Sequence, residues 1–156
     1  MLVAAAIAAM PVSATPVSTG SDAAAEIARA LTPRENFRSM ILMTLEHNNA
    51  IAEIAKTVGT PRADALLAEA AEEMSFRYAD AWESGLAAAY RTSLTPTELA
   101  DALSAVRRAD RAALAPISVR VGSAFFRNSQ GLLRKATDEA ARHATEEANR
   151  HGSAGG

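Results

Sequence analysis

Threonine–proline pairs divide most of this chain into segments with a helical pattern. The pairs are Thr32-Pro33, Thr60-Pro61 and Thr95-Pro96, and apolar residues follow each pair at steps of three and four. Threonine caps a helix N-terminus, and proline suits the first helical position because its missing N–H would have no partner there. After Thr32 and Thr95, a glutamate three residues later completes a capping box. The pattern predicts an all-α fold.

The apolar periodicity predicts a bundle of about five helices. The expected helices run from Ser21-Asp22 to about Leu31, from Pro33 to Val58, from Pro61 along an apolar face that reaches Ala89, from Pro96 along a face that reaches Ile117, and from Ser129, capped by Asn128, to about His151.

Several positions interrupt this pattern. His47-Asn48-Asn49 is a point at which the second helix can break in two. Pro116 would cost about 3 kcal/mol inside a straight helix, so we expect a kink or break at Leu114-Ala115. The stretch Ser118-Val119-Arg120-Val121 alternates like a strand, but no second strand exists for it to pair with, so helix is predicted. Gly85 is expected to permit close contact between helices.

Alanine limits how the core can form. It is the commonest residue in the chain, and it favours helix strongly while burying little apolar area. A compact core therefore requires alanine-lined helices that approach one another closely. With 156 residues, we expect a single helical domain over residues 21–151, followed by a frayed tail at 152–156.

The N-terminus resembles a secretory signal. No charged side chain precedes Asp22, Leu2 begins an apolar run that ends at Met10, and Val12 and Ala14 suit cleavage before Thr15. The run is too short to span a bilayer, which needs about 20 residues, although no basic residue precedes it. We predict a signal peptide at 1–14, a linker at 15–20, and a periplasmic or secreted protein. The alternative is an alanine-rich helix packed on the body.

Composition argues against several functions. A net charge of −2 disfavours nucleic-acid binding. The absence of cysteine excludes disulfides, thiolate nucleophiles and cysteine-ligated metals. No G-x-S-x-G, S-x-x-K, H-E-x-x-H, Walker or dinucleotide-binding pattern occurs. We therefore predict no enzymatic activity, no cofactor and no metal.

One acidic and histidine-bearing face remains a metal candidate. Glu139, His143, Glu147 and His151 are four residues apart, so they share one face of a helix. Carboxylate and imidazole can hold a transition metal, but the four positions span about 18 Å, so one ion cannot touch all of them. A solvated face is expected, and His47 is expected to be exposed on a different helix.

An envelope glycan-cleaving enzyme is the alternative to a non-enzymatic role. Glu83-Ser84 resembles the glutamate–serine pair around the catalytic acid of lytic transglycosylases. That family continues shortly afterwards with glycine, leucine, methionine and glutamine, whereas the nearest likeness here begins only at Gly131 and has Arg134 in place of the amide. A surface glutamate is therefore the expectation for Glu83.

Two further groups could bind a partner. A basic segment could meet phosphate headgroups, in a peripheral membrane contact, or an acidic protein, but Asp101 and Asp110 interrupt it, and a solvated face is expected. A cavity between Tyr78-Trp82 and Phe125-Phe126 could carry a small apolar ligand, although we expect these aromatic rings to fill the core. The basic segment consists of Arg91, Arg107, Arg108, Arg111 and Arg120.

The stretch from Leu86 to Lys135 resembles the domain of unknown function 2059 family, whose members are exported bacterial helical proteins. That family typically has an aromatic residue before a Phe-Thr-x-x-Glu-Leu helix start, then an aromatic pair followed by Ser-Pro-x-Gly. Here Asn128 occupies the serine position, and the separation between the two motifs is longer by several helical turns. The resemblance implies a secreted or periplasmic protein and brings no catalytic residues. The matching residues are Tyr90, Thr95, Glu98, Leu99, Phe125, Phe126, Asn128 and Gly131.

Together these observations predict an exported, non-enzymatic helical-bundle protein that acts through contacts with a protein or an envelope component.

Overall fold

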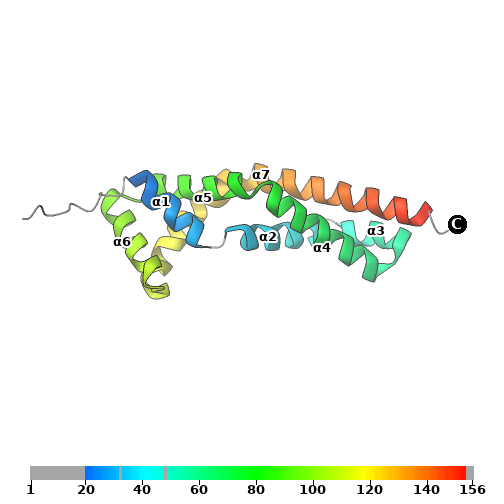
Figure 1. Cartoon of the computed structure of the whole chain (residues 1–156), viewed down its shortest axis with the longest axis horizontal. Helices are drawn as coiled ribbons and strands as arrows, with labels where there is room; N and C mark the ends of the chain where they lie inside the picture. The colour runs from blue at the N-terminus through cyan, green and yellow to red at the C-terminus, as the bar shows by residue number, and fades with distance from the viewer. Residues whose placement is uncertain (1–19, 32, 48, 154–156) are drawn as a thin grey trace, which may run out of the picture.

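The computed structural model describes residues 20–31, 33–47 and 49–153, which form seven α-helices and no strand (Figure 1). The all-α prediction is confirmed, with two more helices than the expected five. The helices are α1 (Gly20–Ala30), α2 (Pro33–His47), α3 (Ala50–Val58), α4 (Thr60–Arg77), α5 (Ala79–Ser93), α6 (Pro96–Arg107) and α7 (Arg111–Ser153).

The molecule is elongated, and α7 runs along its whole length (Figure 1). This helix has 43 residues, which corresponds to roughly 64 Å at 1.5 Å per residue. The helices α1, α5 and α6 gather around its N-terminal half, whereas α2, α3 and α4 lie along its C-terminal half. The helix α7 spans both groups, and α2 and α5 also pack against each other where the groups meet.

The core consists of two clusters of buried apolar side chains. The α4 cluster contains Phe37, Ile41, Leu45, Ile54, Ala63, Leu66, Leu67, Ala70, Ala71, Met74, Trp82, Ala136, Ala140, Ala144 and Ala148. The α1 cluster contains Ala23, Ala24, Ile27, Ala89, Tyr90, Leu94, Leu99, Ala102, Leu103 and Val121. The half-buried Phe125 packs against both clusters, so its ring lies where they meet.

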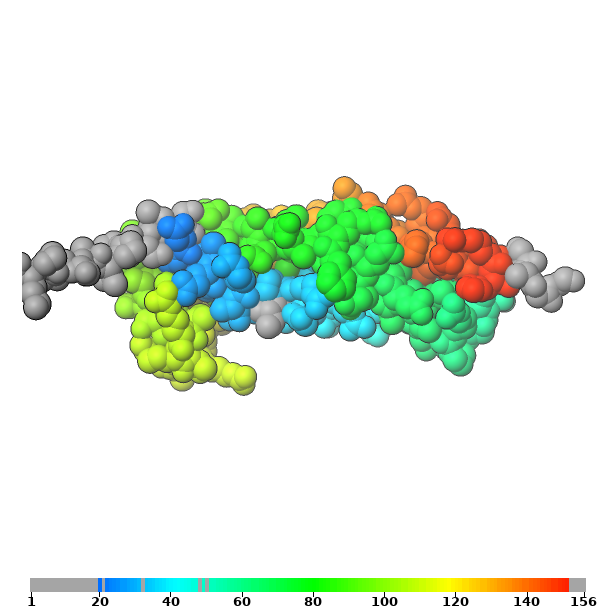
Figure 2. Space-filling model, in the orientation of Figure 1, coloured from blue at the N-terminus to red at the C-terminus, as the bar shows by residue number. Residues whose placement is uncertain are grey.

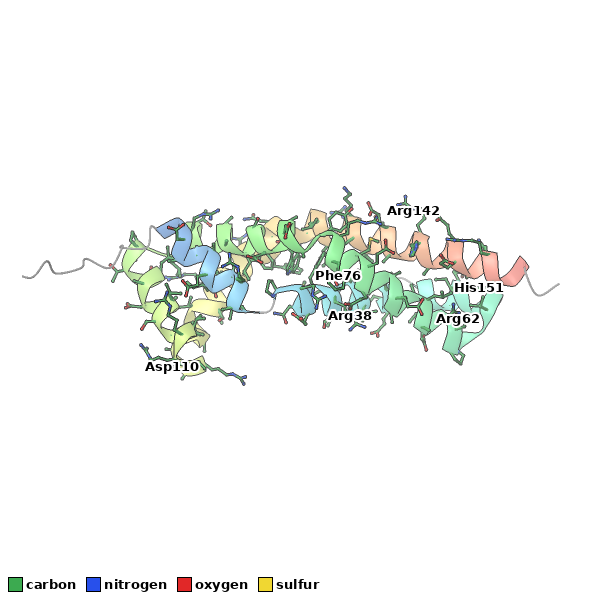
Figure 3. All side chains as sticks on the ribbon, viewed as in Figure 1. Arg38, Arg62, Phe76, Asp110, Arg142 and His151 are labelled. Carbon is green, nitrogen blue, oxygen red and sulfur yellow. The ribbon has the colours of Figure 1, made fainter. Side chains whose placement is uncertain are left out.

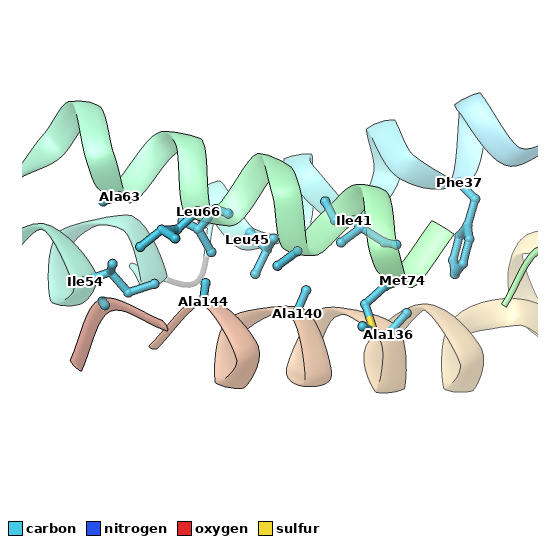
Figure 4. Packing of buried hydrophobic residues seen from close by; sticks show 14 of the residues in the cluster. Phe37, Ile41, Leu45, Ile54, Ala63, Leu66, Met74, Ala136, Ala140 and Ala144 are labelled. Atoms are coloured by element: carbon cyan, nitrogen blue, oxygen red, sulfur yellow. The ribbon is translucent and has the colours of Figure 1, made fainter. Parts of the chain in front are cut away.

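Small residues let the helices approach closely. Ala136, Ala140, Ala144 and Ala148 form a buried stripe on α7, and Figure 4 shows the first three facing side chains from α2 and α4. A Cβ placed on Gly85 would lie 3.4 Å from Phe125 Cε2. Both findings confirm that close helix approach compensates for the shortage of large apolar residues.

The helix boundaries confirm some sequence signals. The expected break after His47 is present, and Asn49 adopts a left-handed conformation with φ of 55°. The capping box at Thr95 is complete: Glu98 N–H donates to Thr95 Oγ1 over 3.3 Å, and Thr95 N–H donates to Glu98 Oε2 over 2.8 Å. The segment at 118–121 is helical, as predicted.

Other boundary predictions were wrong. The long helix expected after Pro61 is divided at Tyr78, whose backbone has φ −108° and ψ 9°. The break is only one residue wide, and the backbone hydrogen bonds continue on both sides of it. Tyr78 N–H donates to the Met74 carbonyl, and Trp82 N–H donates to the Tyr78 carbonyl. Such a small break does not require glycine or proline. Thr60 does not cap α4; it is the first helical residue, and Gly59 precedes it without a side-chain cap.

Of the kink or break expected near Pro116, the break was wrong, because α7 passes through this residue. The chain turns earlier, where Ala109 N–H donates to the Val106 carbonyl and Asp110 N–H to the Ala105 carbonyl, which is a Schellman motif. Asp110 then caps α7 by accepting from Ala113 N–H over 3.0 Å. Pro116 stands just after the first turn and is exposed, so it costs only one bond at the helix start.

The C-terminal helix therefore begins at Arg111, not Ser129. Asn128 is an exposed residue in the middle of α7 and caps nothing. The helix continues to Ser153, two residues past the expected end, and Gly20, assigned to the linker, begins α1. The signal peptide at 1–14, the rest of the linker, Thr32 and residues 154–156 lie outside the described residues.

Candidate functional site

The face that carries Glu139, His143, Glu147 and His151 joins α7 to α4. Tyr78 Oη donates to Glu139 Oε2 over 2.8 Å, and Arg77 Nη1 donates to the same oxygen over 3.2 Å. The Tyr78 hydrogen bond, followed by the charges of Arg77 and Lys135, lowers the pKa of Glu139. The sequence predicted a solvated face here. The Glu139 carboxylate instead links α7 to the end of α4.

The two histidines of this face also contact α4. His143 Nδ1 lies 3.5 Å from Glu73 Oε2, and His143 Nε2 lies 3.9 Å from Glu147 Oε1. His151 Nε2 lies 3.2 Å from Arg62 Nη2, and Figure 3 shows these residues side by side at the end of the bundle. Within residues 20–31, 33–47 and 49–153, no group of three His, Asp or Glu side chains could hold a metal ion.

Glu83 and His47 lie on different helices, and their side chains have different polar neighbours. Glu83, on α5, is partly exposed, and its Oε1 lies 3.6 Å from Arg29 Nε on α1. His47 is exposed at the end of α2, with its Nδ1 2.6 Å from the Met43 carbonyl oxygen. Glu83 thus faces a guanidinium at the surface, whereas a general acid of raised pKa needs an apolar pocket.

Arg107, Arg108 and Arg111 of the basic segment lie at the corner between α6 and α7. This corner projects from the body (Figure 2) and carries Asp110 at its tip (Figure 3). Arg107 donates to both carboxylate oxygens of Glu26 at 2.8 Å. These bonds lower the pKa of Glu26 and raise that of Arg107. Arg120 donates to Glu98 Oε1 over 2.7 Å, and Arg108 to Ser104 Oγ. Arg107 therefore links α6 to α1 and Arg120 links α7 to α6, whereas the Arg108 bond stays within the end of α6.

The residues shared with the family pattern divide into three places. Tyr90 and Leu99 are buried in the α1 cluster, with Phe125 packed against them. Thr95 and Glu98 form the cap of α6. Backbone N–H donation from Thr95, then Arg120 and the Thr95 hydroxyl, lower the pKa of Glu98 to about 2. Phe126, Asn128 and Gly131 are exposed on α7.

The aromatic residues expected to fill the core do so only in part. Phe37 stacks on Trp82 with ring centroids 4.2 Å apart, and Phe125 and Trp82 meet edge to face with centroids 4.6 Å apart. Tyr78 turns instead toward Glu139, and the ring of Phe126 is 50% exposed. The two pairs therefore do not enclose a common cavity.

A groove runs between α2 and α7, which we name the α2–α7 groove. One part has a volume of about 270 Å³ and a second part about 480 Å³, and both are lined by Thr44 and Leu133. Met43, which is 59% exposed, and Phe126 both line the first part. The remaining lining residues are Met40 and His47 in the first part and Gln130, Arg134, Thr137 and Asp138 in the second.

A second hollow, which we name the junction cavity, lies where the α1 and α4 clusters meet and has a volume of about 270 Å³. Tyr90 is only 2% exposed, and its burial raises the pKa of its hydroxyl. The main walls are Trp82, Leu86 and Tyr90 from α5 and Val121, Gly122 and Phe125 from α7.

Sequence reasoning did not identify Met43 as a site residue, and it placed Tyr90 only in the family pattern. Met43 stands one position off the apolar face that contains Met40 and Thr44, and a large apolar residue off such a face is a signal of an exposed contact. No comparable signal shows that Tyr90 lines a hollow, because that depends on which helices pack around its ring.

Comparison with known proteins adds no relative. No family model, no curated protein and no solved structure matches the chain. Among the described helices, none is both long enough and apolar enough to cross a lipid bilayer.

Proposed function

We propose that this chain is an exported, non-enzymatic helical-bundle protein of the periplasm that acts by binding a protein partner through the α2–α7 groove. The observation that carries the proposal is the exposure of Met43 and Phe126 on one groove. Burying such a side chain stabilises a protein by about 1.5–3 kcal/mol. Two of them left in solvent on facing helices are typical of a contact surface.

The shape and chemistry of the groove favour an amphipathic helix as the partner segment. Its floor lies between two neighbouring helices, and Met40, Met43, Phe126 and Leu133 supply an apolar centre. Methionine side chains adapt to different apolar partners, and helix-in-groove recognition uses such surfaces.

The second part of the groove favours a protein over an anionic lipid surface. Arg134 and Asp138 both line it, so charges of opposite sign lie beside the apolar centre. A polypeptide can present complementary charges to both residues. An anionic headgroup would be attracted by the arginine and repelled by the aspartate.

Export is supported by the uncharged, alanine-rich start that precedes Asp22. The resemblance to the domain of unknown function 2059 family points to the same compartment and remains a prediction. Mass spectrometry of the mature protein from fractionated cells tests it. A chain that begins at Thr15 in the periplasmic fraction is expected, and an intact Met1 in the cytoplasmic fraction would contradict export.

Photo-crosslinking tests the groove. A photoreactive amino acid placed at Met43 or Phe126 is expected to give one discrete adduct in intact cells, with the partner peptide identified by mass spectrometry. Val119 is the matched control, because it is 75% exposed on α7 and does not line the groove. The double variant Met43→Gln and Phe126→Gln is expected to abolish an adduct formed from Leu133. Equal adducts from Val119, or an adduct that survives the double variant, would refute the groove.

Glycan cleavage is tested separately with Glu83→Gln. Glu83 faces Arg29 at the surface, so we expect neither the parent nor the variant to release soluble fragments from purified peptidoglycan. Release by the parent and its loss in the variant would establish the enzymatic alternative.

A further inference from the structure

We propose that the α2–α7 groove takes a partner helix whose apolar row is flanked by two acidic residues seven positions apart. This pairing rests on the proposed function, in which the groove binds a protein, and adds the charge pattern of the partner segment. Phe126 and Leu133 line the groove and are seven residues apart, and an arginine follows each of them, Arg127 and Arg134. These two arginines select the partner.

Arg127 and Arg134 lie along one edge of the groove. Seven residues are nearly two turns of an α-helix, so the two side chains leave α7 on the same side, about 10 Å apart along its axis. Both are exposed, and Arg134 lines the second part of the groove. Apolar residues at seven-residue spacing with charges beside them are typical of a seam between two helices, in which the charges set partner choice.

These two arginines differ from those that join helices elsewhere in the protein. Arg29, Arg38 and Arg107 each pair with a glutamate of another helix. Arg127 and Arg134 have no ion pair or side-chain hydrogen bond with the rest of the described chain. A helix docked on the apolar centre of the groove would lie beside both guanidinium groups, so the partner can supply the carboxylates.

Arg120 shows how a neighbouring helix meets this row of arginines. It precedes Arg127 by seven residues and donates to Glu98 Oε1 over 2.7 Å. Glu98 lies in the first turn of α6, so α6 begins beside Arg120 and runs from there toward its corner with α7. A second helix that lies beside α7 past this point would bring its own carboxylates to Arg127 and Arg134.

Asp138 limits how acidic the partner can be. It follows Arg134 by four residues, about one helical turn, and lines the same part of the groove. A partner that is acidic along its whole length, or an anionic lipid surface, would be repelled at this position. The arrangement therefore favours a helix with acidic residues opposite the two arginines and none opposite Asp138.

Two synthetic helical peptides test the charge pattern on the full chain. Both carry the same row of leucines; beside it, one has two glutamates seven positions apart and the other has two lysines there. This spacing is the same in either chain direction. Fluorescence anisotropy of labelled peptides measures the affinities. We expect the glutamate peptide to bind about tenfold more tightly, because two attractions replace two repulsions, and we expect added salt to reduce the difference.

A charge-reversed variant locates the contact. Arg127→Glu combined with Arg134→Glu is expected to make the lysine peptide the tighter ligand. The fold should persist, because both positions are exposed and glutamate suits a helix about as well as arginine. Arg111→Glu combined with Arg142→Glu is the matched control. These two arginines are also exposed on α7, lack a side-chain partner among the described residues, and lie outside the groove; Figure 3 marks Arg142. The control should still prefer the glutamate peptide.

The peptides and the photo-crosslinking experiment separate the two proposals. Equal affinity for both peptides, or binding of neither, would overturn the charge pattern. The groove itself is judged by the cellular adduct from Met43, which does not depend on the peptides.

Two other occupants are tested with the charge-reversed variant. Sedimentation of the parent with vesicles of equal parts phosphatidylglycerol and phosphatidylcholine, lost in Arg127→Glu with Arg134→Glu, would assign the arginines to lipid. A dimer of the parent that the same variant dissociates would assign them to a second copy of this chain. We expect neither, and either result would overturn the inference.

Discussion

The α4 cluster and the α1 cluster use alanine in opposite ways. In the α4 cluster, α7 contributes only alanines, and the leucine, isoleucine, phenylalanine and methionine side chains come from the facing helices. In the α1 cluster, alanines lie on α1, α5 and α6, and Val121 is the large side chain that α7 contributes. A uniform alanine stripe lets large partners close over it evenly. The α1 cluster instead mixes large and small residues from several helices, and the junction cavity lies where the two clusters meet.

The largest expected effect comes from filling the alanine stripe. Ala140 is fully buried against the α4 cluster, so Ala140→Leu forces side chains and backbone apart and should lower the free energy of unfolding by about 3 kcal/mol. Urea denaturation measures the loss. Ala112→Leu is the control, because Ala112 is exposed on the same helix and should leave the midpoint nearly unchanged. Equal midpoints for both variants would show that the stripe tolerates larger residues.

A smaller effect, of opposite sign, is expected from a substitution at Thr137, which lies next to the alanine stripe. Its Oγ1 is buried and has no hydrogen-bond partner among the described residues. Thr137→Val keeps the shape and removes the unsatisfied hydroxyl, so the free energy of unfolding should rise by about 1.5 kcal/mol. Ser75 is the contrast, since its buried hydroxyl donates to the Glu72 carbonyl over 2.7 Å. Ser75→Ala should give no such gain, and a loss in Thr137→Val would contradict the reasoning.

Replacing Ala109 with glycine is expected to raise the free energy of unfolding by about 1 kcal/mol. Ala109 has φ of 54° within the Schellman motif between α6 and α7, a conformation that glycine adopts without steric cost. We expect Ala109→Gly to raise the denaturation midpoint. Asn49→Gly is the companion change at φ 55°, and it should do less because asparagine tolerates this region. A destabilised Ala109→Gly would mean that the turn is not strained.

The smallest effect is expected from acid at the α6 cap. The pKa of Glu98 is lowered from 4.5 to about 2, so its ionised form contributes stability above about pH 4.5, and this contribution is lost as the pH falls toward 2. Glu98 is exposed, so solvent screens most of the effect. Glu98→Gln should therefore melt slightly below the parent at pH 6 and at the same temperature at pH 2. A difference that persists at pH 2 would indicate a loss of packing, not of charge.

The sequence predicted the helix boundaries that depend on residues close together along the chain. The cap at Thr95 and the break after His47 follow from local chemistry. The division at Tyr78 could not be read in this way, because its hydroxyl bonds to Glu139, which is 61 residues away. The proline rule failed at Pro116 because its cost depends on the distance from the helix start, and that start is set by Asp110, which had been read as an interruption.

The candidate sites show the same limit. Trp82 and Phe125 were named as possible borders of a ligand cavity but were expected to fill the core, because a sequence shows aromatic residues without showing what surrounds them. Which of their neighbours face a cavity, and whether Met43 is covered, depends on the pairing of α2, α5 and α7. Periodicity assigns a residue to a helix face, but it does not say which other helix lies opposite that face.

The alanine stripe of α7 has a consequence for alignment along the bundle axis. Identical small side chains at every fourth position present nearly the same surface after each turn, so a slide of α7 along α4 by one turn, about 5.4 Å, would meet similar apolar contacts. The stripe therefore fixes how closely the helices approach and leaves their longitudinal register to other residues. The hydrogen bonds from Tyr78 and Arg77 to Glu139, together with the edge-to-face contact between Phe125 and Trp82, select one register among several. A chain without these contacts would keep its helices and lose its single alignment.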